Sequence, residues 1–274
     1  MKILSNMTNQ EKISTDSPLD ELLDGGIDKR TITQFYGPPS VGKTNICLNI
    51  AIGVAKRGKK VVYIDTEGGI SVDRIRQISG EDFDAVAKNI IVFEPTSFKE
   101  QEEDLGLIES WISSNSADVE LIILDSAVAL FRVEDDKSKS HFLGKQMQML
   151  SALAINFDLA VLVTNQIYAS FDEESEEDFS PVGGTIIQYR SKIIIELKRE
   201  EGTNQRIAIL KRHKTKREGL AVHFVITNNG IEWFFINGIE YQFPIFLYYF
   251  FSLMELNINS LSFFITFFIL FINF

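Results

Sequence analysis

The stretch Gly37-Pro38-Pro39-Ser40-Val41-Gly42-Lys43-Thr44 decides the fold of this chain. It fits the phosphate-binding loop pattern G-x-x-x-x-G-K-S/T at every fixed position. An apolar run over residues 31–36 precedes it, and residues 45–51 follow with apolar side chains at helical spacing. The stretch therefore joins a strand to a helix, as the motif requires. The alternative, a chance glycine-rich turn, does not account for these flanks, and we predict a nucleoside triphosphate site.

The chemistry of such a loop follows from its glycines and from the helix behind it. Glycine lets successive backbone N–H groups turn toward the phosphates with no Cβ in the way. The positive end of the helix dipole adds to that field. Lys43 is predicted to reach the β- and γ-phosphates of the nucleotide, and the Thr44 hydroxyl is predicted to bind Mg²⁺.

Composition narrows the protein class. The 274 residues suffice for one large α/β domain or two small ones. The net charge of −11 argues against a broadly basic nucleic-acid surface, so any DNA binding must use a local patch. The single cysteine, Cys47, excludes an internal disulfide. The polar N-terminus is no secretory signal, and a reducing cytoplasm is the simplest compartment.

The order of the patterns predicts three segments. Residues 1–16 are polar without periodicity and are predicted to be a flexible leader. From residue 17 to 233, strands at 60–65, 90–93, 121–125 and 159–164 alternate with helices, which indicates a largely parallel sheet with right-handed crossovers. Short strands at 191–199, 206–212 and 221–227 then predict an antiparallel extension of that sheet.

Three polar residues follow strands of this predicted sheet. Asp125 ends an apolar strand and is predicted to reach the Mg²⁺ shell; its alternative is a carboxylate that caps the next turn. Glu67 follows the strand after the loop's helix and could polarise a water for attack on the γ-phosphate, or be a surface turn residue. Gln166 ends the strand predicted from residue 159 and could touch the γ-phosphate.

These motifs, taken together, resemble those of the RecA-type recombinases. Besides the phosphate loop and the Asp125 strand, the match rests on residues 24–27 (DGGI), 63–68 (YIDTEG), 164–166 (TNQ) and 181–184 (PVGG). It covers about residues 14–233, and the short archaeal members are the most similar. The resemblance implies a RecA-like P-loop NTPase core, a mostly parallel sheet with helices on both faces.

The resemblance also implies roles for particular residues. Glu67 would be the catalytic glutamate, Gln166 the γ-phosphate sensor leading into a DNA-facing loop, and Arg74 the arginine that stacks on adenine. The alternative for Arg74 is a solvated helix arginine. The implied activity is weak ATP hydrolysis with DNA binding but without strand exchange, in an accessory role in recombinational repair. The main recombinase and a junction-resolving nuclease are the expected protein partners.

Two features depart from the family pattern. A full recombinase has an N-terminal DNA-binding domain and a linker that docks one subunit on the next, whereas only the predicted leader precedes the core here, so self-association stays open. The loop at 171–178 carries six carboxylates, which would repel DNA. It is predicted to be a solvated loop or a strip that mimics DNA or docks a basic partner.

Positive charge is concentrated in the turn between two of the predicted antiparallel strands. We call this the basic cluster; its members are Lys211, Arg212, Lys214, Lys216 and Arg217. Three interpretations stay open: contact with DNA phosphates, a finger that reaches the ATP of a neighbouring subunit, as the corresponding region does in the RecA family, or a solvated hairpin.

The composition changes sharply at residues 234–274, which hold 12 of the 22 phenylalanines and no lysine or arginine. The apolar runs 243–254 and 261–274 are shorter than the ~20 residues that span a bilayer. The tail is interpreted as an extension foreign to the fold, with a membrane anchor and a core role as alternatives. For the whole chain, a non-catalytic ATP-gated adaptor and a KaiC-like signalling ATPase are the alternatives to the accessory ATPase.

Overall fold

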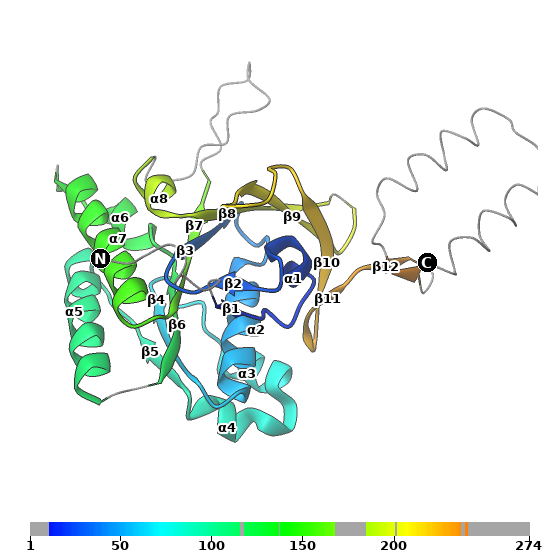
Figure 1. The fold of residues 1–274 in the computed structure, drawn as a ribbon, viewed down its shortest axis with the longest axis horizontal. Coiled ribbons are helices and arrows are strands. Elements are labelled where there is room, and N and C mark those ends of the chain that lie inside the picture. Colours follow the sequence, from blue (N-terminus) through cyan, green and yellow to red (C-terminus); the bar gives the residue numbers. More distant parts are fainter. Residues whose placement is uncertain are drawn as a thin grey trace, which may run out of the picture. The chain divides into compact units, whose positions relative to one another are not determined.

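The computed structural model describes residues 11–115, 118–136, 138–167, 185–200, 202–236 and 239–240, and its centre is a nine-stranded sheet (Figure 1). The strand order is β11-β10-β9-β8-β3-β7-β6-β4-β5. In chain order these strands are β3 (Ile32–Gly37), β4 (Lys60–Asp65), β5 (Ile90–Phe93), β6 (Val119–Asp125), β7 (Ala160–Gln166), β8 (Ile193–Arg199), β9 (Gln205–Arg212), β10 (Ala221–Thr227) and β11 (Gly230–Trp233).

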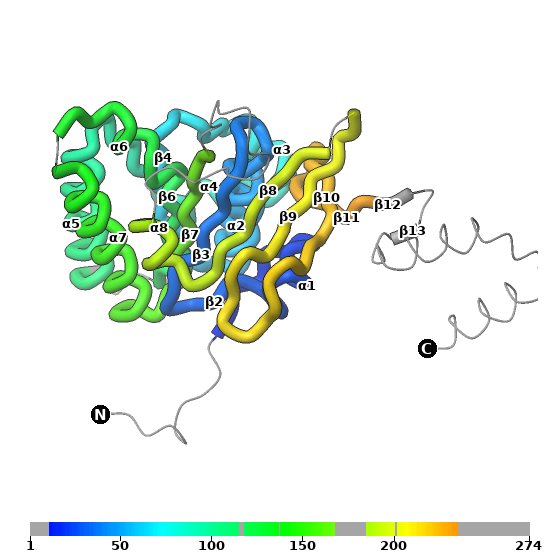
Figure 2. The backbone as a smooth tube through the Cα atoms, turned by 90° about the horizontal axis from the view of Figure 1, so that it is seen from above, coloured from blue at the N-terminus to red at the C-terminus, as the bar shows by residue number. Residues whose placement is uncertain are grey.

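The pairing within the sheet confirms the predicted change from parallel to antiparallel. β3, β4, β5, β6, β7 and β8 pair in parallel, and β9, β10 and β11 extend the sheet antiparallel from β8. Figure 2 shows β8 to β11 side by side at one end of the sheet. The sequence reasoning did not predict β11, a four-residue strand that follows β10 after a short turn.

Helices cover both faces of the sheet, as predicted (Figure 1). The helices are α1 (Leu19–Leu23), α2 (Lys43–Lys56), α3 (Val72–Ser79), α4 (Phe83–Ala87), α5 (Phe98–Asn115), α6 (Ala129–Val133), α7 (Lys139–Asn156) and α8 (Thr185–Arg190). One buried cluster joins the sheet to α1 and α2, and a second joins the opposite face to α5 and α7. Because strands between two helical layers have no polar face, β6 is apolar from Leu121 to Leu124.

The carboxyl ends of the parallel strands meet at one edge of the sheet and bring distant polar residues together. In the register, Gly37 at the end of β3 lies opposite Gln166 at the end of β7. Asp65 at the end of β4 lies opposite Asp125 at the end of β6. Ligands of open α/β sheets bind at such an edge.

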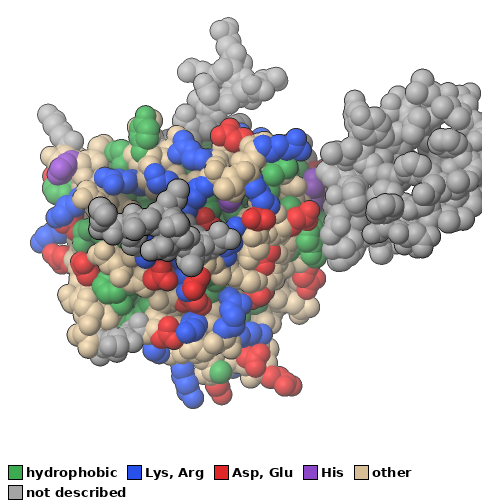
Figure 3. Space-filling model, viewed as in Figure 1, with side chains coloured by type: hydrophobic (Ala, Val, Ile, Leu, Met, Phe, Trp, Pro, Cys, Tyr) green, Lys and Arg blue, Asp and Glu red, His purple; other side chains and the backbone are tan. Residues whose placement is uncertain are grey.

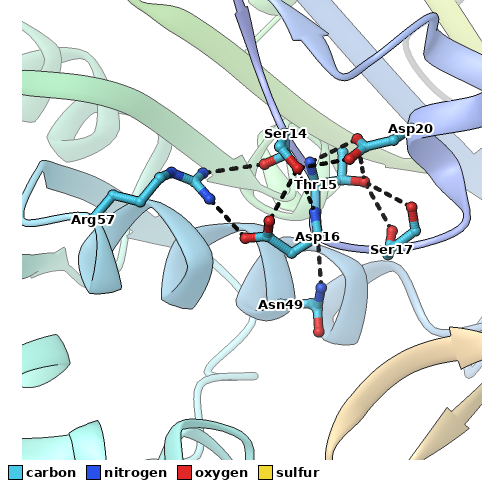
Figure 4. Close-up of polar contacts among 7 residues, drawn as sticks. All are labelled: Ser14, Thr15, Asp16, Ser17, Asp20, Asn49 and Arg57. Carbon is cyan, nitrogen blue, oxygen red and sulfur yellow. Dashed lines mark hydrogen bonds and ion pairs between the residues drawn. The ribbon is translucent and has the colours of Figure 1, made fainter.

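The expectation of a flexible leader over residues 1–16 is wrong for residues 11–16. Here β1 (Lys12–Ile13) pairs antiparallel with β2 (Ile27–Asp28). Figure 4 shows the polar residues that follow β1 bonded to one another and to α2: the Thr15 carbonyl accepts from the Asn49 amide at 3.0 Å, and Asp16 pairs with Arg57 at 2.7 Å. Apolar periodicity cannot reveal a segment held by hydrogen bonds. Residues 1–10 lie outside the described part.

The chain divides into two units, Met1–Phe234 and Phe235–Phe274. In the second unit the described residues form a short antiparallel pair, β12 (Phe235–Ile236) and β13 (Ile239–Glu240). The rest of the predicted tail lies outside the described residues, so its three interpretations stay open. Among the described helices, none is long and apolar enough to cross a membrane.

Candidate functional site

The phosphate-binding loop connects β3 to α2. Its backbone has positive φ at Ser40 (60°) and at Gly42 (110°), the residue before α2. A Cβ at Gly37 would lie 2.4 Å from the carbonyl oxygen of Leu197, so only glycine fits where the loop leaves β3 against β8. Buried Val41 anchors the middle of the loop in the core. The backbone N–H groups at the start of α2 are thereby presented at the sheet edge.

Lys43 is buried beneath this loop. Its Nζ donates to the carbonyl oxygens of Gly37 and Pro38, each at 2.9 Å. Burial lowers the pKa of the Lys43 ammonium, while the charges of Glu67 and Asp125 oppose this shift. The ammonium therefore lies inside the loop, where an anion would compensate its charge.

Asp125 lies at the carboxyl end of β6, where it is 4% exposed. Its carboxylate accepts hydrogen bonds from the Tyr63 hydroxyl at 2.8 Å and from the hydroxyls of Thr164 and Thr44. Burial raises the pKa of Asp125, and these three hydrogen bonds oppose the rise. The Thr44 hydroxyl and the carboxylate of Asp125 are hard oxygen ligands side by side. They fit Mg²⁺, which takes one or two protein groups and completes its shell with water and phosphate.

Glu67 and Gln166 meet in one chain of hydrogen bonds. Oε1 of Glu67 accepts from Nε2 of Gln166 at 2.8 Å and from the Ser126 hydroxyl at 2.6 Å. Oε1 of Gln166 in turn accepts from Nη1 of Arg132 at 2.7 Å. The sequence reasoning missed Ser126 and Arg132. Adjacency to Asp125 was the available signal for Ser126, whereas no sequence signal pointed to Arg132.

The turn that carries Glu67 is shaped by a residue to which the sequence reasoning gave no role. The buried carboxylate of Asp65 accepts from the backbone N–H groups of Glu67 at 3.1 Å, Gly69 at 3.1 Å and Ile70 at 2.8 Å. Three such bonds fix the backbone on both sides of the turn. The direction of the Glu67 side chain thus depends on Asp65.

A pocket of about 550 Å³ unites most of these groups. It is lined by Pro39, Ser40, Gly42, Lys43, Thr44, Asn45, Glu67, Asp125, Gln166, Arg206 and Ile226. Most of the predicted loop residues, the Mg²⁺ pair, Glu67 and Gln166 thus share one pocket, although their roles stay predictions. Arg206 and Ile226 come from the antiparallel extension, and the sequence reasoning did not place them at the site.

Arg74 lies outside the lining of this pocket. Its Nε donates to Asn45 at 2.9 Å, and its Nη groups donate to the carbonyl oxygens of Thr227 at 2.8 Å and Asn228 at 3.2 Å, and to Gln77. Arg74 therefore fastens α3 to the turn between β10 and β11. The prediction that it stacks on adenine stays untested.

The basic cluster lies at the opposite edge of the sheet from the phosphate loop. Arg212 pairs in register with Ile194, near the start of β8, and Figure 2 shows the β9–β10 turn beside β2 and α1. Lys214 pairs with Asp28 at 3.0 Å, and Lys216 donates to the Glu21 carbonyl at 2.7 Å. These two side chains of the basic cluster are thus paired with oxygen atoms of the chain itself. The three interpretations of the cluster remain open.

The other members of the basic cluster differ in how they are held. Arg212 donates to the Gln188 carbonyl at 2.6 Å at the end of α8, and Lys211 lies 3.6 Å from Glu196. Figure 3 shows Lys and Arg side chains gathered at the top of the face that it displays. The predicted acidic loop at 171–178 and the motif at 181–184 lie outside the described residues.

Comparison with known proteins gives a consistent result. The sequence profile of the Rad51 family matches residues 8–233. The chain is 55% identical over 233 residues to the DNA repair and recombination protein RadB of Methanobrevibacter smithii, covering 84% of this chain and 100% of that protein. It is 48% identical, with the same coverage, to RadB of Methanothermobacter thermautotrophicus. A crystal structure of the RadB recombinase is 34% identical with a TM-score of 0.68, covering 80% of this chain and 98% of that one.

Proposed function

The chain belongs to the Rad51 family, and from this premise we propose that it is a weak ATPase and a DNA-binding accessory protein of homologous recombination and repair. It acts in the cytoplasm without strand exchange of its own. Its proposed protein partners are the main recombinase and a junction-resolving nuclease. The relatives named DNA repair and recombination protein RadB support this assignment.

The observation that carries the proposal is the convergence of Lys43, Thr44, Asp125, Glu67 and Gln166 on one pocket. Lys43 binds the β- and γ-phosphates in exchange for its present bonds to the loop carbonyls. Thr44 and Asp125 hold Mg²⁺, which neutralises charge on the phosphate oxygens when bound. Glu67 orients and polarises a water molecule, and Gln166, bonded to Glu67, senses the γ-phosphate.

A second candidate is an adaptor that binds ATP, docks a partner and needs no turnover. It is favoured by the contacts of Glu67, whose Oε1 already accepts two hydrogen bonds, from Ser126 and Gln166. That oxygen can accept a proton from a water molecule only after one of these two donors is displaced, which is consistent with slow or absent hydrolysis.

The decisive experiment measures ATP binding and ATP turnover with and without single-stranded DNA, with Lys43→Ala as the control. We expect slow turnover in the wild type and none in the variant, because the loop loses its cation. ATP binding without turnover above the variant's level, with or without DNA, would favour the adaptor. A wild type that does not bind ATP would refute both candidates.

A further inference from the structure

Arg206 is a buried cation that the proposed mechanism does not use. It lies on β9, is 8% exposed, and lines the same pocket as Lys43, Thr44 and Glu67. Its Nη1 donates to the backbone and side-chain oxygens of Asn204, which hold the guanidinium in place. Its Nε is buried without a hydrogen-bond partner. A buried donor left unpaired costs free energy unless a ligand satisfies it.

A second arginine stands directly across from Arg206. Arg199 on β8 pairs with Arg206 in the antiparallel register, so the two side chains share one face of the sheet. Burial lowers the pKa of Arg206, and the charge of Arg199 lowers it further. Among the described residues, no carboxylate forms an ion pair with either arginine. Like charges facing each other are destabilising by themselves, and a bound anion would offset this repulsion by attracting both guanidinium groups.

The fold shows which anion fits. Ile226 lies on β10, the strand next to β9, and its side chain reaches Gly42. A Cβ built on Gly42 would lie 2.4 Å from Cδ1 of Ile226. The antiparallel extension therefore lies against the phosphate loop itself. Arg206 lines the same pocket as Lys43 and Thr44 at the start of α2. The arginine and the phosphate loop therefore belong to one subunit.

We propose that Arg206, assisted by Arg199, is a phosphate-binding arginine of the nucleotide site, contacting the polyphosphate of ATP from the antiparallel extension opposite Lys43. This inference deepens the proposed function and depends on it. Arginine suits the role because its planar fork donates two hydrogen bonds to phosphate and keeps its charge when buried. The basic cluster at the other edge of the sheet is not involved in this contact.

The test compares the affinities of the full-length protein for ATP, ADP and AMP by titration calorimetry. Arg206→Gln is expected to weaken ATP and ADP binding by ~10-fold or more, the scale of a lost charge-assisted hydrogen bond, while AMP binding changes less. Arg199→Gln should also weaken ATP and ADP binding more than AMP binding, but by a smaller factor. The ATP affinity of Arg206→Lys should lie between those of the wild type and Arg206→Gln. Arg190→Gln, an exposed arginine at the end of α8, is the matched control and should bind like the wild type.

Thermal unfolding separates a ligand-binding role from a structural one. If Arg206 serves the ligand, the nucleotide-free Arg206→Gln protein keeps or raises its Tm, because a like-charge pair is removed, and the rise in Tm on adding ATP becomes smaller. A lower Tm with unchanged nucleotide affinity would show that Arg206 only braces the turn at Asn204, and would overturn the proposal.

The remaining outcomes are equally decisive. If Arg206→Gln does not fold, Arg199→Gln and Arg206→Lys carry the test, and nucleotide affinities equal to the wild type in both would overturn the proposal. Loss of DNA affinity with nucleotide affinity intact would assign the arginines to DNA instead. A wild type that binds no nucleotide would refute the proposed function as well, whereas a wild type that binds ATP beside an unaffected Arg206→Gln refutes the inference alone.

Discussion

Glu67 shows how a single side chain determines the proposed chemistry. Gln at this position keeps the shape and can still accept from Ser126 and Gln166, but it cannot act as a base. We expect Glu67→Gln to bind ATP like the wild type while turnover falls by ~10²-fold or more. A steady-state phosphate-release assay measures this, with Glu94→Gln, an exposed residue just after β5, as control. Wild-type turnover in Glu67→Gln would show that the assignment is wrong.

Arg74 carries two hypotheses that one variant separates. Because its guanidinium bonds to the carbonyls of Thr227 and Asn228, we expect Arg74→Ala to destabilise the nucleotide-free protein by about 1 kcal/mol, hence by about 2–4 °C in Tm. Differential scanning fluorimetry measures this, with Lys99→Ala, whose side chain is 87% exposed, as control. An unchanged Tm combined with weaker ATP binding would support the contact with adenine and contradict the structural role.

The residues that sequence reasoning could name at this site share one property. Lys43, Thr44 and Asp125 belong to local patterns in which a strand end or a loop defines the chemistry. Arg132 and Arg206 belong to no such pattern, since they reach the site from α6 and β9 only after the chain has folded. Arg74 could be named by its resemblance to the family, but its bonds to the β10–β11 turn span 153 and 154 residues and leave no local trace.

At the scale of elements, α2 is joined to both ends of the described fold through Asn49. Its amide donates to Thr15 and its oxygen accepts from the backbone of Ile231 at 3.2 Å. Asn49→Ala leaves both backbone groups buried and unpaired, so we expect a loss of about 2 kcal/mol and several degrees in Tm. Asn156→Ala, an exposed asparagine near the end of α7, is the matched control. Equal Tm values for the two variants would contradict this account.

The basic cluster allows a sharper test than its complete removal. Arg212, Lys214 and Lys216 bind oxygen atoms within the chain at 2.6 to 3.0 Å. Lys211 is held only by Glu196, at 3.6 Å, so we expect a Lys211→Ala and Arg217→Ala double variant to remove most of the charge that is available to DNA. If DNA is the ligand, the slope of log K against log salt should fall by about 2, close to one for each lost phosphate contact. Fluorescence anisotropy over a salt series measures it, with Lys88→Ala and Lys99→Ala as the control pair.

The other interpretations of the cluster predict different results for the same double variant. The finger that reaches a neighbouring subunit would be favoured by unchanged DNA binding and a loss of ATP turnover. In that case the specific ATP turnover of the wild type should rise with protein concentration. No change in either measurement would leave a solvated hairpin.

Elements with a strong period were predictable, and those held by polar contacts were not. The apolar strands β4, β6 and β7 alternate with helices along the chain, and this order predicted the parallel sheet. The strands are apolar throughout because each is buried on both faces. The pair of β1 and β2 has two residues in each strand, which is too few for a period to show. The residues that follow β1 are held by hydrogen bonds to α2 and to the start of α1, as at Thr15, and only the folded chain brings these groups together.

At the scale of the whole molecule, the open question is what residues 234–274 add. The sheet ends with β11 at Trp233, and the Rad51 match ends at the same residue. Two relatives align over their entire length with 84% of this chain. The pocket residues and both buried clusters all lie before that point.

We therefore expect the chain shortened to end at Trp233 to stay in solution, unfold cooperatively and bind ATP with the affinity of the full chain. Gel filtration, thermal unfolding and calorimetry measure these properties, and a chain shortened to end at Ile209, which lacks the end of β9 together with β10 and β11, is the control that should not fold. The physical reason is that every strand of the central sheet and every residue of the pocket is retained. Aggregation of the shortened protein, or loss of its ATP binding, would instead show that the phenylalanine-rich tail buries surface that the sheet needs.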